Sequence, residues 1–156
     1  MSNDLKQLSK YLERMRIPVR LACTTKSGWP MVISLWYQYQ DGKLYCATKK
    51  SARIVSYLLN NPRCAFEIAA DQPPYCGVRG QATAVIDKNI GAKILKSLIQ
   101  RYIGEMDNTL AKNLLKNQDE EVAIVLEPIK VFSWNFSKRM IEIAPSMLAL
   151  SSKFCP

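Results

Sequence analysis

The sequence predicts a mainly β domain of the α+β class, a small and mostly antiparallel barrel of six strands with short helices between them. Six segments combine strand-forming residues with turn residues at their ends, and the helical patterns that separate them are short. The chain has 156 residues, of which 48% are hydrophobic and 22% are charged. This size and composition are typical of one globular domain, which we place over residues 1–156.

An N-terminal helix is expected within residues 1–16. Its apolar residues fall three and four apart and therefore share one helical face; they are Leu5, Leu8, Leu12 and Met15. Pro18 ends this helix, and residues 19–24 then alternate between the two faces of a strand. Residues 26–28, Lys-Ser-Gly, form the turn that follows.

The next two strands are joined by the clearest turn signal in the chain. Residues 31–40 are rich in β-branched and aromatic side chains, and residues 43–48 continue the strand pattern. Asp41 and Gly42 stand between them and suit a type I′ hairpin, because both central positions of that turn need positive φ. We therefore expect the first three strands to form an antiparallel meander.

The rest of the chain alternates helices with longer strands. Helices are predicted over residues 51–60, 90–103 and 109–115. Strands are predicted over residues 63–69, 77–87 and 122–134. Ser51 is placed to accept hydrogen bonds from the amides of the first turn of its helix, and Pro128 indicates an edge position or a β-bulge in the last strand. Residues 141–156 form an apolar C-terminal tail without a clear period.

The composition excludes several kinds of active site. The chain has no His, so it supplies neither a Ser-His-Asp or Cys-His nucleophile system nor a His ligand to zinc or haem, and we expect no metal site. It shows no signal peptide and no run of about 18 apolar residues, which predicts a cytoplasmic protein. The five Cys form no C-x-x-C pair and are expected to be small buried hydrophobes.

The net charge of +9 suggests nucleic acid as a partner, but the distribution of the charges gives this function little support. The basic residues are mostly dispersed along the chain, and no basic stripe with interleaved aromatic residues is present. Nucleic-acid binding is therefore the weakest of the functions that we consider.

Residues 48–53, Thr-Lys-Lys-Ser-Ala-Arg, place three cations at the start of a predicted helix. The free N–H groups of a first helical turn already present about half a positive charge, so this arrangement is unfavourable by itself. A phosphate there would accept hydrogen bonds from the amides and from Thr48 and Ser51, with charge from Lys49 and Arg53. The alternative is an exposed basic helix start, which costs only about 0.3–1 kcal/mol.

A second candidate lies on residues 31–37, Met-Val-Ile-Ser-Leu-Trp-Tyr. This strand has one apolar face and carries Ser34 and Trp36 on the other. A flat conjugated ring could lie along it and form hydrogen bonds with its backbone. Ordinary packing in a barrel core explains the same pattern.

Five segments follow one another in order between residues 17 and 134. They are R-L-A-C-T-T-K-S-G-W-P, D-G-K-L-Y-C-A-T, S-A-R-I-V-S-Y-L-L-N-N-P-R, P-P-Y-C-G-V-R-G-Q-A and V-F-S-W-N. In this order and spacing they resemble the flavin-binding split-barrel proteins related to pyridoxamine 5′-phosphate oxidase. The resemblance implies a six-stranded antiparallel split β-barrel that forms a homodimer with two FMN cofactors at the subunit interface.

The resemblance also implies which residues would bind FMN. The ring-binding strand matches Val32, Ile33 and Ser34, whose backbone would face the pyrimidine side of the isoalloxazine. Gln81 matches a polar contact to the ring, and Trp134 matches an aromatic residue near the pocket.

The family's phosphate-binding turn matches Thr48, Ser51 and Arg53, with Lys49 nearby. This is the same turn that the electrostatic argument singles out. A large supply of aromatic residues for one small barrel is also consistent with a dimer, because aromatic side chains are enriched where subunits meet. These residues are Trp29, Trp36, Tyr37, Tyr39 and Trp134.

We therefore expect a flavin-dependent oxidoreductase that acts on a small organic substrate. Two departures argue against oxidation of pyridoxamine phosphate itself. Pro30 precedes Met31 where the ring-binding strand of the oxidases begins with Arg, and no His is present for their substrate-binding Arg–His pair.

Two alternatives keep the fold. One is a reductase that uses the deazaflavin F420, whose anionic tail would need further basic residues such as Lys50, Arg63 and Arg79. The other is a non-catalytic protein that holds flavin or another anionic ligand.

Overall fold

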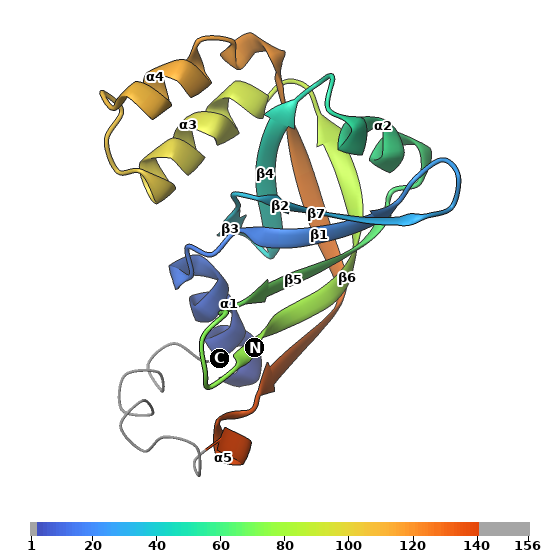
Figure 1. Ribbon diagram of the computed structural model, residues 1–156, viewed down its shortest axis with the longest axis vertical. Helices are drawn as coiled ribbons and strands as arrows, with labels where there is room; N and C mark the ends of the chain where they lie inside the picture. Colours follow the sequence, from blue (N-terminus) through green and yellow to red (C-terminus); the bar gives the residue numbers. More distant parts are fainter. Residues whose placement is uncertain (1–2, 141–156) are drawn as a thin grey trace.

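A computed structural model describes residues 3–140, which form one seven-stranded antiparallel sheet with helices packed on it (Figure 1). The strands are β1 (Val19–Thr24), β2 (Pro30–Leu35), β3 (Gln38–Gln40), β4 (Lys43–Lys49), β5 (Arg63–Ala69), β6 (Cys76–Asp87) and β7 (Glu121–Asn135). The helices are α1 (Asn3–Arg14), α2 (Arg53–Asn60), α3 (Gly91–Tyr102), α4 (Thr109–Leu115), the 3₁₀ turn η1 (Gln118–Glu120) and α5 (Ser137–Met140). The predicted tail 141–156 lies outside the described residues.

The sheet has seven strands rather than the six expected, because the predicted strand 31–40 is divided in two. Its strand order is β2-β1-β5-β6-β7-β4-β3, so β2 and β3 lie at opposite ends. Only Trp36 and Tyr37 separate them in the chain, so the sheet must curl until its two edges approach each other. Figure 1 shows this curl: β1 and β2 run across the view, whereas β4, β6 and β7 run along it. The expected meander is correct for β1–β2 and β3–β4 but wrong between β2 and β3.

Two turn predictions are confirmed. Asp41 and Gly42 have φ values of 50° and 80° and join β3 to β4, as a type I′ turn requires. In β7 the register shifts beside Pro128: Gln81 faces Lys130, Ala82 faces Pro128, and Ile129 is the extra residue of a bulge. The strand itself lies between β6 and β4, so Pro128 marks a bulge and not an edge strand.

The predicted helices are present, but one expected cap is wrong. The helix at 51–60 begins at Arg53 with Ala52 as its N-cap, and no side chain caps its first turn. Ser51 therefore lies one residue before the cap instead of accepting the first-turn amides. No helix among residues 3–140 is long and apolar enough to cross a membrane.

The main core lies on one face of the sheet, which we call the inner face. It receives Tyr11, Leu12 and Met15 from the α1 segment and the apolar side of α2. On the opposite, outer face, α3 packs against Ala123 and Val125 of β7, and α4 packs on α3. The outer face of β2, β1, β5 and the middle of β6 is not covered by these helices.

Candidate functional site

The uncovered outer face is organised in rows of cross-strand partners, which point to the same side of the sheet. The first, which we call the charged row, consists of Ser34 (β2), Arg20 (β1), Glu67 (β5), Arg79 (β6) and Phe132 (β7). The second, which we call the small-residue row, consists of Val32, Ala22, Ala65, Gln81 and Lys130 on the same five strands.

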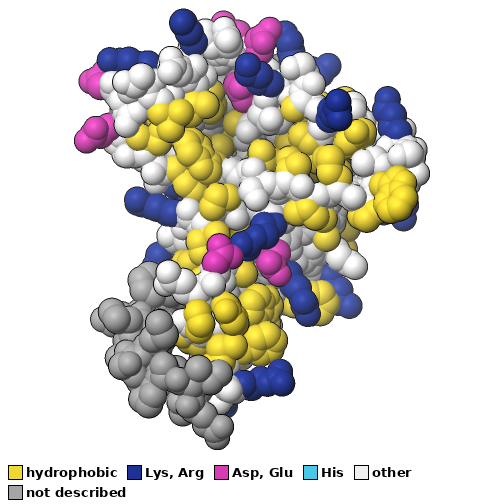
Figure 2. Space-filling model, viewed as in Figure 1, with side chains coloured by type: hydrophobic (Ala, Val, Ile, Leu, Met, Phe, Trp, Pro, Cys, Tyr) yellow, Lys and Arg dark blue, Asp and Glu magenta, His cyan; other side chains and the backbone are white. Residues whose placement is uncertain are grey.

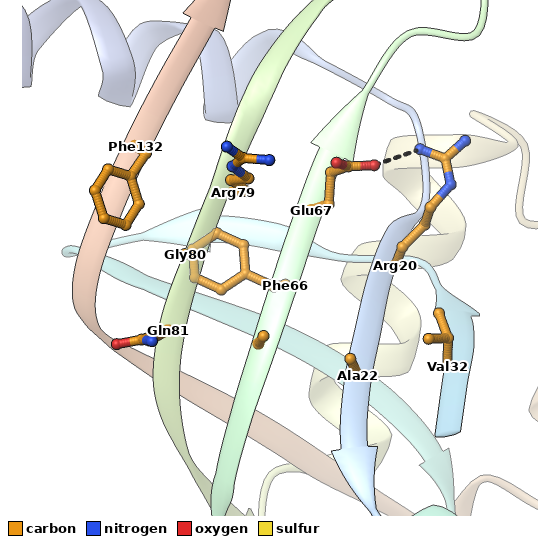
Figure 3. Close-up of a pocket in the computed structure, with 10 residues that line it drawn as sticks. Arg20, Ala22, Val32, Phe66, Glu67, Arg79, Gly80, Gln81 and Phe132 are labelled. Carbon is orange, nitrogen blue, oxygen red and sulfur yellow. Dashed lines mark ion pairs between the residues drawn. The ribbon is translucent and has the colours of Figure 1, made fainter. Parts of the chain in front are cut away.

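A groove of about 440 Å³ lies over these two rows (Figure 3). Ala22 and Ala65 are short, so they leave a hollow between the longer side chains of Val32, Gln81 and Phe132. A second groove of about 410 Å³ shares Ala22, Ala65 and Gln81 with the first. The two grooves therefore share part of one floor, and the second extends toward Thr24, Arg63 and Ile129.

The charges in the charged row are not equally paired. Arg20 donates to Asp71 at 2.5 Å and to the Ala69 carbonyl at 3.2 Å, and it lies 3.6 Å from Glu67. Arg79 forms no ion pair within 4.0 Å with any residue of the described chain. Figure 2 shows acidic and basic side chains next to one another over β1 and β5, with hydrophobic surface above and below them.

The structure brings two of the predicted ring-binding residues into the first groove. Val32 is 62% exposed and lines it from β2, and Gln81 lines it from β6. Ser34 is exposed on the same face, whereas Ile33 packs toward the core opposite Leu21. Because β2 is an edge strand of the described sheet, alternate N–H and C=O groups along it point away from β1.

The predicted phosphate turn lies elsewhere and does not line either groove. Thr48 is half-buried at the end of β4, and Lys49, Ser51 and Arg53 are exposed. Since Ala52 provides no side-chain cap, the amides at the start of α2 receive no capping side chain.

The positive charge of this turn is partly compensated. Lys50 lies 3.7 Å from Glu120, and Lys49 faces Glu121 across the β4–β7 ladder. Burial raises the pKa of Glu121, and the positive charge of Lys49 opposes that rise. Arg53 forms no ion pair within 4.0 Å among residues 3–140, so it is the member of the turn whose charge is least compensated.

Trp134 is placed away from the groove residues. It pairs with Gly77, four positions along β6 from Gln81, which corresponds to about 13 Å of strand. Its ring lies 5.2 Å from that of Phe136, and its Nε1 is buried with no hydrogen-bond partner in the described part of the chain.

The described cysteines do not provide a reactive site. Cys23, Cys46 and Cys64 are buried free thiols, as expected, and burial raises the pKa of Cys64 to about 11. Cys76 differs from the prediction, because it is disulfide-bonded. Residues 3–140 contain no cluster of three or more Cys, Asp or Glu that could hold a metal ion.

Sequence reasoning missed most of the groove. The alternation in residues 19–24 separates Ala22 from Leu21 and Cys23, and residues 63–69 were predicted as a strand without an assignment of faces. These patterns could not show that β1 and β5 are neighbours, because β5 follows β4 in the chain but pairs with β1. Phe132 was missed for the same reason, since its pairing with Arg79 depends on the bulge at Ile129.

Comparisons with known proteins support the fold. No family model and no curated protein matches the sequence. A solved structure of a conserved hypothetical protein from Mycobacterium tuberculosis is 21% identical, with a TM-score of 0.72 over 89% of this chain and 88% of that one. An F420 reductase is 20% identical, with a TM-score of 0.67 over 80% and 94% of the two chains.

A third solved structure, a putative pyridoxamine 5′-phosphate oxidase from Listeria innocua, is 15% identical, with a TM-score of 0.62 over 82% of this chain and 95% of that one. At these identities the likeness concerns the fold. The chain has the fold of the split-barrel proteins related to pyridoxamine 5′-phosphate oxidase.

Proposed function

We propose that this protein is an FMN-binding oxidoreductase that acts on a small organic substrate as a homodimer, with the cofactor at the subunit interface. The observation that carries the proposal is the groove on the uncovered outer face, because Val32 and Gln81, two residues matched to the isoalloxazine ring, line it together. The fold that the chain shares with an F420 reductase and a putative pyridoxamine phosphate oxidase is consistent with this use.

The residues present fit FMN at both of its ends. Along β2, Val32 and Ser34 would present an exposed face and an edge backbone to the ring. At the start of α2, the uncapped amides, the Ser51 hydroxyl and the guanidinium of Arg53 would bind the phosphate. Thr48 and Lys49 adjoin this turn. FMN would supply hydride or electron transfer, and the protein would hold and orient it and enclose the reacting groups.

The ring-binding groove and the phosphate turn lie in different places in one chain, which favours a cofactor site shared between two subunits. Within one chain the phosphate turn lines neither groove, so the two regions need not hold one FMN in the same subunit. A cofactor shared between two subunits would take its ring contacts and its phosphate contacts from different copies. Trp134, at the end of β7, would approach such a site from the partner.

An F420-dependent reductase is the second candidate, favoured by the match to a solved F420 reductase over 94% of that chain. The ring would use the same strand, and Lys50, Arg63 and Arg79 would be the basic residues near the anionic tail. Lys50 already lies near Glu120, which makes it a weaker ligand than the other two. A non-catalytic protein that holds flavin or another anionic ligand is the remaining alternative.

An absorption spectrum of the purified protein, followed by titration of the apoprotein with FMN and with F420, tests the proposal. We expect FMN to bind and to raise the melting temperature. Arg53→Gln should weaken FMN binding by about tenfold or more, because a charge-assisted bond to the phosphate is lost. Arg16→Gln is the matched control, because Arg16 is exposed and lies outside the proposed site.

Three outcomes would decide against FMN-dependent catalysis. Binding of F420 without FMN would favour the second candidate. Bound FMN that no nicotinamide donor reduces and no acceptor reoxidises would favour the non-catalytic protein. Failure to bind either cofactor would overturn both redox proposals.

A further inference from the structure

The groove contains one positive charge that the rest of the described chain does not neutralise. Arg20 is engaged by Asp71, Glu67 and the Ala69 carbonyl. Arg79, two strands away in the same charged row, has no acidic group within 4.0 Å among the described residues. Figure 3 shows Arg79 standing between Phe132 and Glu67 at the border of the groove. An unpaired guanidinium beside an apolar hollow is a suitable partner for an anionic group on a ligand.

The surroundings of Arg79 suggest the body of that ligand. Phe132 is its cross-strand neighbour and is 46% exposed. The Lys130 ammonium lies 5.1 Å from the centre of the Phe132 ring. It therefore makes a cation–π contact with Phe132, which leaves Arg79 as the cation available to a ligand. Beside Phe132, the floor of the groove is built from the backbone of Gly80 and the ring of Phe66. A low apolar floor with an aromatic side wall favours a flat, apolar molecule.

The carboxylate of Glu67, next to Arg79, favours a ligand whose head group carries a single negative charge. Glu67 is the other cross-strand neighbour of Arg79, and its carboxylate lies on the same face. A carboxylate can pair with Arg79 through two parallel hydrogen bonds at the cost of one repulsion from Glu67. A second negative charge, as on a phosphate dianion, would find no further unpaired cation in the charged row, because Arg20 is already paired with Asp71.

We propose that the groove binds a planar aromatic carboxylate, with its carboxylate on Arg79 and its ring beside Phe132. If the protein is the oxidoreductase proposed above, such acids are its class of substrate, and in this respect the inference rests on the proposed function. The small-residue row from Val32 to Gln81 would remain for the cofactor ring. Arg79 is then a residue that determines substrate specificity, and a neutral analogue of the same shape binds less tightly.

Binding to the full-length protein can be measured by titration with three probes that share one ring system: 2-naphthoate, 2-naphthamide and 2-naphthyl phosphate. We expect 2-naphthoate to bind about tenfold or more tightly than 2-naphthamide, because only the acid pairs with Arg79. Arg79→Gln should remove that preference, and Arg79→Lys should restore part of it. Arg16→Gln, the same change at an exposed position outside the groove, should keep the full preference.

Melting temperatures and sedimentation of each variant show whether it keeps the fold and assembly of the parent. Equal binding of the acid and the amide, or an acid preference that survives Arg79→Gln, would overturn the inference. Tighter Arg79-dependent binding of 2-naphthyl phosphate would overturn the choice of a carboxylate.

A separate FMN titration distinguishes this inference from the proposed function. FMN binding without any preference for 2-naphthoate would overturn the inference alone. An Arg79-dependent preference in a protein that binds neither FMN nor F420 would support the acid site and contradict the proposed function.

Discussion

At the scale of single residues, Gly91 is the glycine at which an added Cβ would meet other atoms most closely. A Cβ at this position would lie 2.0 Å from the Glu121 carbonyl oxygen and 2.6 Å from the Cα of Val122. Both atoms belong to the backbone of β7, so they cannot move aside as a flexible side chain could. The absence of a side chain at Gly91 therefore allows the start of α3 to lie directly on the start of β7.

We predict that Gly91→Ala lowers the free energy of unfolding by about 1–3 kcal/mol, as overpacking of a rigid site does. Helix propensity alone predicts the opposite sign, since Ala in place of Gly stabilises a helix by about 1 kcal/mol. Chemical denaturation measures the difference. Lys96→Ala, at an exposed position of the same helix, should change stability by less than about 0.5 kcal/mol. If Gly91→Ala were as stable as the parent or more stable, the start of α3 would not pack as closely on the β7 backbone as the structure indicates.

At the scale of elements, α3 also supports the bend between β2 and β3. The Tyr102 hydroxyl accepts a hydrogen bond from the Tyr37 backbone N–H at 3.2 Å and donates to the Ile17 carbonyl at 3.4 Å. Its ring stacks on Trp36 at 5.0 Å, with 7° between the ring planes. Tyr37 itself is buried and donates to the Leu12 and Met15 carbonyls at the end of α1. One helix thus holds the two residues at which the strand breaks.

Tyr102→Phe should therefore destabilise the protein by about 1–3 kcal/mol, because the buried Tyr37 N–H loses its partner while the ring stack with Trp36 is kept. Denaturation midpoints of the variant and the parent provide the measurement. Tyr75→Phe is a matched control, because Tyr75 is 39% exposed and a loss of its hydroxyl should change little. If the two variants were equally stable, the hydrogen bond to Tyr37 would not be what supports the bend.

The same bend shows what sequence patterns could predict at this scale. The hairpin at Asp41 and Gly42 was predictable because the type I′ turn selects for those residues directly. The helices at 109–115 and near the N-terminus were predictable from local periodicity. The break at Trp36 and Tyr37 was not, because both residues favour strands and the bend is stabilised by α3, a segment more than 60 residues away.

At the scale of the whole molecule, the resemblance to a known family predicted the fold. The groove, in contrast, is formed by strands that are distant in the chain and pair in the sheet. Val32 and Gln81 were expected near one cofactor, and both line one groove. The cap assigned to Ser51 was wrong, because the helix begins after Ala52. The unbalanced charge of the phosphate turn was also overstated. Glu120 and Glu121 lie there because β7, about 70 residues later in the chain, pairs with β4, which local sequence could not reveal.

The uncovered outer face is also where a second subunit would bind. It exposes Val32 by 62%, Ile129 by 72% and Phe132 by 46%. Aromatic and aliphatic side chains in this number are typical of the buried centre of a subunit interface. The charged row contains both signs, so two copies related by a twofold axis could place opposite charges near each other. This face is therefore the one that we expect the proposed homodimer to bury.

Sedimentation at micromolar concentration tests this assembly. We expect a dimer for the parent and a monomer for Ile129→Glu. Ile129 is exposed in the single chain, so the substitution should not disturb the fold, but in the dimer it would place a charge in a buried apolar contact. Leu110→Glu is the matched control: Leu110 is 52% exposed on α4, away from the uncovered face, and its variant should stay dimeric. A monomeric parent would remove the shared cofactor site. A dimer that survives Ile129→Glu but dissociates with Leu110→Glu would move the interface to the α3–α4 side, and the groove would then be open to solvent in the assembled protein.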